Sequence, residues 1–316
     1  MSHDHSLMEC GTDDARAFEI GDYAGPLPRW CAGCGDHAVL AGVQRLLARE
    51  QLRPERTVFV SGIGCSSRFP HYVDTYGFHG IHGRALPVAT GIKLSRPELD
   101  VWAVMGDGDC TSIGAAHWVH AVRYNVDMTV LMLDNNIYGL TKKQTSPTTP
   151  QGLKSNTQPR GSFLPPLNPL SVTLGITNAS FVAQTADWVP SHLAKTLELA
   201  HAHPGFSFVR ILQRCPVFTP EVFQAAATDT DMTELLVHEN GVEDAALARV
   251  YAHTLRHDPS DIHEARRLAE PGARVRLGVF FRDDDLPCYE KIRAVPHRTA
   301  EERMRLIDEE FDRHAV

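Results

Sequence analysis

The chain has 316 residues, of which 43% are hydrophobic and 22% charged, and its formal net charge is −8. These values are typical of a folded globular protein, and the net negative charge gives no reason to expect nucleic acid or an anionic membrane as a partner. No apolar run approaches the roughly 20 residues that span a bilayer. Residues 1–11 are polar and His-rich and lack the apolar core of a signal peptide, so we expect a cytoplasmic protein.

Short apolar runs that alternate with helical segments predict an α/β fold. We expect strands at 57–60, 101–105, 128–133 and 207–212. We expect helices at 36–49, about 112–124 and 191–201. Because the strands are apolar without alternation, they predict a parallel sheet covered by helices on both faces. Ligands of such folds bind at the carboxyl ends of the strands.

The chain divides by composition into three parts. Residues 1–28 are expected to form an extended arm, residues 29–220 the main cofactor-binding domain, and residues 221–316 a C-terminal extension that docks on a partner. The extension has one expected strand, at 275–281. Within the main domain, residues 138–168 are rich in Pro, Thr and Ser and have no helical or strand period. A loop of that length tends to be functional or disordered.

Two of the expected strands end in residues that suit a cation and a diphosphate. Gly106-Asp107-Gly108-Asp109 follows one strand, and Asp134-Asn135-Asn136-Ile137 follows the next. Mg²⁺ prefers hard oxygen ligands, which the Asp107 carboxylate, the Asn135 amide and the Ile137 carbonyl can provide. The glycines allow close approach of phosphates to a helix N-terminus. Either turn alone would be ordinary, but the pair is similar to the thiamine diphosphate motif of transketolases, decarboxylases and oxoacid oxidoreductases.

Four cysteines lie at turns or strand ends in three regions of the chain: Cys31, Cys34, Cys65 and Cys215. Four thiolates suit either a tetrahedral Zn²⁺ or a cubane iron–sulfur cluster, and the Cys-x-x-Cys spacing alone favours zinc. A thioredoxin-like dithiol is less consistent with the flanking sequence. The other cysteines, Cys10, Cys110 and Cys288, are expected to be ordinary thiols.

Five motifs, in order, resemble those of the β subunit of 2-oxoacid:ferredoxin oxidoreductases. They are Trp30-Cys31-Ala32-Gly33-Cys34-Gly35-Asp36, Gly62-Ile63-Gly64-Cys65-Ser66-Ser67-Arg68, His82-Gly83-Arg84-Ala85, Gly106-Asp107-Gly108-Asp109 and Tyr138-Gly139-Leu140-Thr141-Lys142. The resemblance covers about residues 25–220. It implies that Cys31, Cys34, Cys65 and Cys215 hold one [4Fe-4S] cluster, that Asp107, Asn135 and Ile137 bind Mg²⁺, and that Lys142 faces the substrate.

Further residues are expected at the cofactor. The thiamine diphosphate is expected to contact His82, Gly83, Arg84, Gly106, Asp107, Gly108, Asp109, Asn135, Ile137, Tyr138, Gly139 and Leu140. Arg68 is a candidate partner for a phosphate or carboxylate, although a surface ion pair is nearly as good an interpretation. No glutamate stands where it could activate the aminopyrimidine. In the family the α subunit supplies that glutamate, so this chain is expected to be inactive alone.

The implied reaction is oxidative decarboxylation of a 2-oxoacid with coenzyme A as acyl acceptor and ferredoxin as electron acceptor, or the reverse carboxylation, in an α₂β₂ assembly. Asp109 with Ser112-Ile113-Gly114 and His117 is more similar to the 2-oxoglutarate branch than to the pyruvate branch. Pyruvate or a broad range of 2-oxoacids is the alternative. Two rivals remain: a thiamine decarboxylase subunit without redox chemistry, and a non-catalytic zinc-binding assembly subunit.

Overall fold

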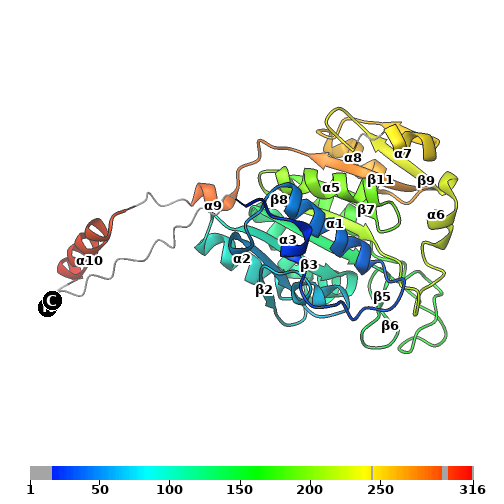
Figure 1. Ribbon diagram of the computed structural model, residues 1–316, viewed down its shortest axis with the longest axis horizontal. Helices are drawn as coiled ribbons and strands as arrows, with labels where there is room; N and C mark the ends of the chain where they lie inside the picture. Colours follow the sequence, from blue (N-terminus) through cyan, green and yellow to red (C-terminus); the bar gives the residue numbers. More distant parts are fainter. Residues whose placement is uncertain (1–15, 243–244, 294–297, 315–316) are drawn as a thin grey trace.

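The computed structural model describes residues 16–242, 245–293 and 298–314, and these residues form a nine-stranded sheet between helices (Figure 1). The strand order is β10-β9-β11-β7-β8-β4-β3-β1-β2. The strands are β1 (Thr57–Ser61), β2 (Tyr76–His79), β3 (Asp100–Gly106), β4 (Met128–Asp134), β7 (Phe181–Ala186), β8 (Phe206–Leu212), β9 (Thr233–Val237), β10 (His253–Arg256) and β11 (Val275–Arg282). All neighbours are parallel except β11 and β7, which are antiparallel.

Helices cover both faces of the sheet. They are α1 (Asp36–Arg49), α2 (Ala85–Ser95), α3 (Ala115–Tyr124), α4 (Pro169–Gly175), α5 (Pro190–Ala202), α6 (Gln224–Thr228), α7 (Ala245–Val250), α8 (Ile262–Ala269), α9 (Tyr289–Ile292) and α10 (Ala300–His314). The sheet has a hydrophobic core on each face. On one face, α1 and α5 pack in the same core as Phe59 of β1. On the other face, α2, α3, α4 and α8 pack in the same core as Val58 and Val60 of β1. Successive residues of one strand are therefore buried on opposite faces, which explains the continuous apolar runs.

The predicted parallel α/β fold is confirmed, with additions. The five expected strands are β1, β3, β4, β8 and β11, and the helices expected at 36–49 and 191–201 are α1 and α5. The helix expected from about 112 is preceded by a π-helical turn, Asp109–Ile113, before α3 begins. Strands β2 and β7 were not expected. The sheet also crosses the predicted boundary at residue 220, because β11 pairs with β7.

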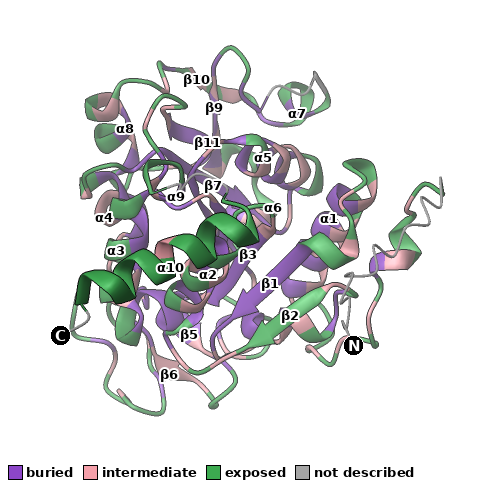
Figure 2. Ribbon diagram, turned by 90° about the vertical axis from the view of Figure 1, so that its left-hand side faces the viewer, coloured by how far each residue is buried: buried purple, intermediate pink, exposed green. Residues whose placement is uncertain are grey.

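The two ends of the described chain differ. Residues 1–15 of the expected arm, including Cys10, lie outside the described residues. The rest of the arm packs on the body, because Tyr23 is fully buried and donates from its hydroxyl to the Leu52 carbonyl at 2.7 Å. Helix α10 lies apart from the body and is exposed along its length (Figures 1 and 2). None of the described helices is both long enough and apolar enough to cross a bilayer.

Candidate active site and thiol cluster

A cavity of about 160 Å³ opens where β1, β3 and β4 end. The lining residues are Ile63, Gly64, Cys65, Ser66, His82, Gly106, Asp107, Gly108, Asp109, Asn135, Ile137, Tyr138, Gly139, Leu140 and Thr141. The parallel strands bring their carboxyl ends to one edge of the sheet, so motifs far apart in sequence meet there. Most of the residues expected to contact the cofactor line this cavity.

The Asp107 carboxylate is held from one side by the long Pro- and Thr-rich loop. Its Oδ2 accepts hydrogen bonds from Ser146 Oγ at 2.5 Å and from Thr148 Oγ1 at 2.6 Å. The Asp107 carbonyl accepts from Thr111 Oγ1 at 2.7 Å, which fixes the turn after β3. Residues 138–168 thus form an ordered loop, with a short hairpin of β5 (Ile137–Tyr138) and β6 (Gln144–Thr145).

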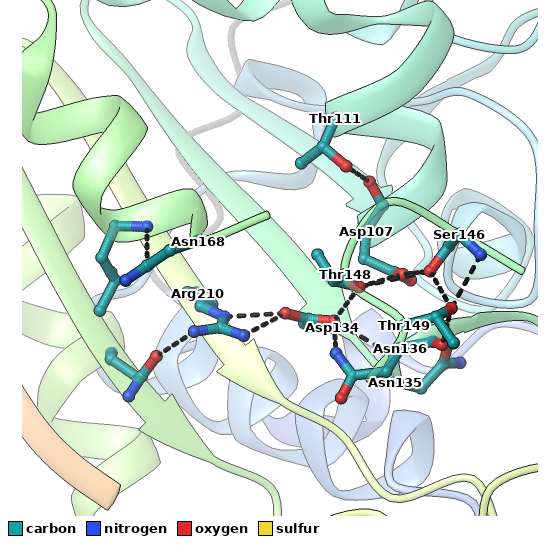
Figure 3. A network of polar contacts seen from close by, with 12 residues as sticks. Asp107, Thr111, Asp134, Asn135, Asn136, Ser146, Thr148, Thr149, Asn168 and Arg210 are labelled. Carbon is teal, nitrogen blue, oxygen red and sulfur yellow. Dashed lines mark hydrogen bonds and ion pairs between the residues drawn. The ribbon is translucent and has the colours of Figure 1, made fainter. Parts of the chain in front are cut away.

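A second buried carboxylate, Asp134, continues this network away from the cavity (Figure 3). Asp134 Oδ1 accepts from Thr148 Oγ1 at 3.0 Å, and its Oδ2 pairs with Arg210 at 2.6 Å. Arg210, on β8, also donates to Gln184 Oε1 at 3.0 Å. A buried carboxylate with a guanidinium partner can stay charged, whereas one without a partner is costly. Burial first, and Asp134 second, raise the pKa of Asp107 to about 7.

The other expected cation ligands lie beside Asp107. Asn135 Oδ1 accepts from the Ile137 backbone N–H at 3.2 Å, and the Asn135 carbonyl accepts from Thr219 Oγ1 at 3.1 Å. Tyr138 donates from its hydroxyl to the Gly108 carbonyl at 3.1 Å. A Cβ on Gly108 would lie 2.1 Å from the Tyr138 ring, so this turn requires glycine.

Asp109 joins three strand-end segments. It accepts hydrogen bonds from His82 Nδ1 at 2.5 Å, from the Gly83 N–H at 2.7 Å and from the Ile63 N–H at 3.3 Å. It is therefore well placed to fix the walls of the cavity. Arg84 is not among the described residues that line the cavity; its guanidinium instead donates to His117 Nε2.

The four expected cluster cysteines line a second cavity of about 210 Å³. Its lining residues are Arg29, Trp30, Cys31, Cys34, Cys65, Arg68, Asn135, Gly139, Leu140, Lys142, Cys215, Pro216, Val217 and Phe218. None of the described cysteines forms a disulfide. Cys65, Asn135, Gly139 and Leu140 line both cavities. The thiols and the Gly-Asp-Gly turn therefore share a wall.

Backbone hydrogen bonds fix the three cysteine segments against one another. The Arg214 carbonyl, beside Cys215, accepts from the Gly35 N–H at 3.1 Å. The indole of Trp30 donates to the Cys65 carbonyl at 2.7 Å. Gly35 lies so close to Asp187 that a Cβ there would be 1.8 Å from Asp187 Oδ2, so the glycine after Cys34 is required by packing. The thiol arrangement is thus built into the fold.

The surroundings of Cys34 and Cys65 disfavour the charged form of their thiols. Burial, and then Asp36, raise the pKa of Cys34, and the same two causes in the same order raise the pKa of Cys65 to about 12. Iron in a cluster supplies the positive charge that such thiolates lack. Among the described residues, no three His, Cys, Asp or Glu side chains form a group that could hold a metal ion. The four cysteines nevertheless line one cavity of about 210 Å³.

Lys142 and Arg68, the two side chains expected to be catalytic, line the thiol cavity rather than the cofactor cavity. Lys142 is exposed, and both it and Lys143 have positive φ, at 74° and 64°. Two consecutive lysines in the left-handed region are strained, which is a feature of functional turns. The Asn156 side chain donates to the Lys142 carbonyl and so supports the turn. Arg68 lies over the Tyr72 ring, 5.7 Å from its centroid.

Ser146, Thr148, Arg210 and Gln213 also belong to the site and were not expected from the sequence, and Asp134, although part of a strand-end motif, was given no role there. Gln213 Nε2 donates to Cys34 Sγ at 3.3 Å. The sequence Ser146-Pro147-Thr148-Thr149 contains several hydroxyls in a long loop. That concentration is the signal that could have indicated a role beyond connection.

Comparisons with known proteins show which families the chain resembles. Residues 62–211 match the model of the thiamine pyrophosphate enzyme C-terminal TPP-binding domain. A relative from Mycobacterium tuberculosis, 2-oxoglutarate oxidoreductase subunit KorB, is 49% identical over 197 residues, which are 62% of this chain and 52% of the relative. The match thus spans about half the length of that protein. From Aeropyrum pernix, 2-oxoacid:ferredoxin oxidoreductase 1, subunit beta, is 37% identical over 257 residues, 80% of this chain and 77% of the relative.

One solved structure extends the likeness to the whole fold. It is the 2-oxoglutarate:ferredoxin oxidoreductase from Magnetococcus marinus with 2-oxoglutarate, coenzyme A and succinyl-CoA bound. The match has a TM-score of 0.78 and 33% sequence identity, and it covers 92% of this chain and 96% of that chain.

Proposed function

Because this chain belongs to the family of 2-oxoacid:ferredoxin oxidoreductase β subunits, we propose that it converts 2-oxoglutarate and coenzyme A to succinyl-CoA and CO₂, with electrons passed to ferredoxin, or the reverse. The observation that carries the proposal is the wall shared by the Gly-Asp-Gly cavity and the thiol cavity. A cofactor in the first cavity and a cluster in the second would be neighbours, as an electron transfer between them requires.

The cofactor cavity would hold thiamine diphosphate through Mg²⁺. The Asp107 carboxylate, the Asn135 amide and the Ile137 carbonyl are the proposed ligands, since Mg²⁺ selects hard oxygen atoms. The buried Asp107 carboxylate, with its raised pKa, has an unmet need for positive charge that the cation satisfies. Tyr138 and Asp109 keep the surrounding turns in place, and the glycines of the turn let the phosphates approach the backbone.

The thiol cavity would hold the [4Fe-4S] cluster through Cys31, Cys34, Cys65 and Cys215. Bound thiamine diphosphate would supply an electron-rich carbon for the oxoacid carbonyl, and a bound cluster would supply a one-electron acceptor. The chain's own contribution is to orient these groups and to limit water between them. Lys142 and Arg68, which line the thiol cavity, are proposed to meet the substrate carboxylate.

The proposed partner is an α subunit. Among the described residues that line the cofactor cavity none is a glutamate, the group that the chemistry still requires. Large apolar side chains are exposed at and near the cavity: Leu140, which lines it, is 46% exposed, Ile81, which precedes the lining residue His82, is 69% exposed, and Ile113 is 57% exposed. Such exposure beside a site favours coverage by another protein. An α₂β₂ assembly in the cytoplasm completes the proposal.

The substrate is tested by comparing kcat/KM for 2-oxoglutarate and pyruvate in the enzyme assembled with its α subunit. The proposal expects a preference for 2-oxoglutarate of at least about tenfold, equivalent to ~1.4 kcal/mol. A preference for pyruvate would contradict the proposed substrate and assign the chain to the pyruvate branch of the family. Zinc in place of iron after anaerobic purification would remove the redox function altogether.

A further inference from the structure

Gln213 contacts both the end of β4 and one of the four cysteines of the thiol cavity. It follows β8 and is 1% exposed, and its backbone N–H donates to the Asp134 carbonyl at the end of β4, at 2.9 Å. Its side chain turns the other way, toward the thiols. Nε2 donates to Cys34 Sγ at 3.3 Å and to the Arg214 carbonyl at 2.5 Å. A buried amide with this pair of contacts has a defined orientation.

The Arg214 carbonyl fixes which end of the amide faces the sulfur. A carbonyl oxygen only accepts, so the NH₂ group of Gln213, and not its oxygen, must face it. The same carbonyl also accepts from the Gly35 N–H at 3.1 Å, which ties it to the Cys-x-x-Cys turn. An amide nitrogen carries two hydrogens. One is directed at Arg214, and the second remains for Cys34 Sγ.

We propose that Gln213 donates a hydrogen bond to the Cys34 thiolate and thereby raises the reduction potential of the cluster. The inference rests on the proposed function, in which Cys34 is a cluster ligand. Hydrogen bonds to the sulfurs are among the factors that set cluster potentials. Reduction adds negative charge to the cluster and its thiolates, so a donor at sulfur stabilises the reduced form more than the oxidised form. Gln213 is buried and Cys34 is partly buried, and a hydrogen bond shielded from water in this way is stronger.

Gln213 acts through Cys34 and is therefore a positioning and tuning residue, not a catalytic one. Its place after β8 also connects the cluster to the cation site, because one residue contacts both Asp134 and Cys34. The backbone N–H of Gln213 makes the hydrogen bond to Asp134, and its side chain makes the hydrogen bond to Cys34. A side-chain substitution can thus remove the donor at sulfur and keep the backbone bond to β4.

The test uses Gln213→Met, which keeps length and bulk but has no donor, with Gln213→Leu as a second variant. Gln44→Met is the matched control, because Gln44 Nε2 donates only to backbone carbonyls, those of Tyr23 at 3.0 Å and Tyr72 at 3.3 Å. Each variant is produced with the α subunit and purified anaerobically. Iron and sulfide are counted, and the cluster's midpoint potential is measured by redox titration followed by EPR.

The inference expects a full cluster with a more negative midpoint in the Gln213 variants and an unchanged midpoint in Gln44→Met. A full cluster with an unchanged midpoint in Gln213→Met would overturn it. Loss of the cluster from both Gln213 variants would also overturn it, because Gln213 would then be a structural support for Cys34. Absence of iron from the unsubstituted enzyme would instead refute the proposed function.

Discussion

Cys65 and Gly139 lie side by side in the wall shared by the two cavities: a Cβ built on Gly139 would lie 3.6 Å from Cys65 Sγ. Cys65 follows β1, and Gly139 follows the turn after β4, so their proximity depends on the parallel sheet. Because residue 139 is a glycine, the space beside the Cys65 thiol is not filled by a side chain from this position.

Replacing Cys65 by Ser should remove or severely damage the cluster, because the thiol lies in the middle of the shared wall. We expect iron and sulfide to fall to a small fraction of the unsubstituted level, with loss of oxoacid-dependent viologen reduction. Cys288→Ser is the control, since Cys288 is buried near Pro204 and does not line the thiol cavity. Retention of a full, redox-active cluster in the Cys65 variant would exclude this cysteine as a ligand.

Replacing Thr148 by Val should weaken cation-dependent binding of thiamine diphosphate. The substitution keeps the shape but removes the hydroxyl that Asp107 and Asp134 share, and a buried acceptor without its donor costs about 1–3 kcal/mol. We expect about a tenfold rise in the apparent Kd for Mg²⁺, measured by titration calorimetry on the assembled enzyme. Thr145→Val removes a hydroxyl from the same loop that contacts Ser155, and it should leave the Kd unchanged. Equal effects in the two variants would contradict a specific role for Thr148.

Replacing Arg210 by Met should destabilise the fold strongly. Asp134 is fully buried and loses its guanidinium, and a buried charge without its partner costs about 3–5 kcal/mol. The exposed pair Arg53–Glu55 offers the comparison, because Arg53→Met should cost at most about 1 kcal/mol. Thermal unfolding of both variants measures the difference. Adding Asp134→Asn to Arg210→Met should recover part of the loss; no recovery would mean that the charge is not the cause.

His192 should make stability depend on pH. It is buried on α5, where burial lowers its pKa from the usual 6.5 to about 4. Between these values the unfolded chain binds a proton that the folded chain does not, so stability falls as pH drops from about 6.5 to about 4. The full effect is about 3 kcal/mol. Unfolding between pH 7 and 5 should show a smaller loss in His192→Asn than in the unsubstituted protein, whereas substituting the exposed His263 should change nothing.

The local pattern of the sequence predicted much of the fold. Helix α1 and strands β1, β3, β4 and β8 were expected because long apolar periods and strand ends in Gly or Asp are local signals. Strand β2 was missed because its residues are exposed at the sheet edge and lack an apolar run. Pairing of β11 with β7 could not be predicted, because the pattern of a strand does not tell which distant strand lies beside it.

The candidate site was predicted where residue type alone suggests chemistry. Asp107, Asn135 and the four cysteines are of that kind, and they line the two cavities. The residues that support them, such as Ser146 and Thr148, were not predicted, since a serine or threonine in a long loop can have many roles. Only folding brings Thr148 to Asp107, and Gln213 to Cys34. Arg84, in contrast, was expected at the cofactor because it belongs to the same motif as His82, but its guanidinium contacts His117.

The central claim is that oxidation of the substrate in one cavity reduces a cluster in the other. The most direct measurement mixes the anaerobic enzyme, assembled with its α subunit and loaded with thiamine diphosphate and Mg²⁺, with 2-oxoglutarate and coenzyme A, and records EPR spectra of rapidly frozen samples. We predict the signal of a reduced [4Fe-4S] cluster, absent without the oxoacid and absent in Cys65→Ser. A fully loaded enzyme whose cluster stays oxidised with every 2-oxoacid tested would contradict the account.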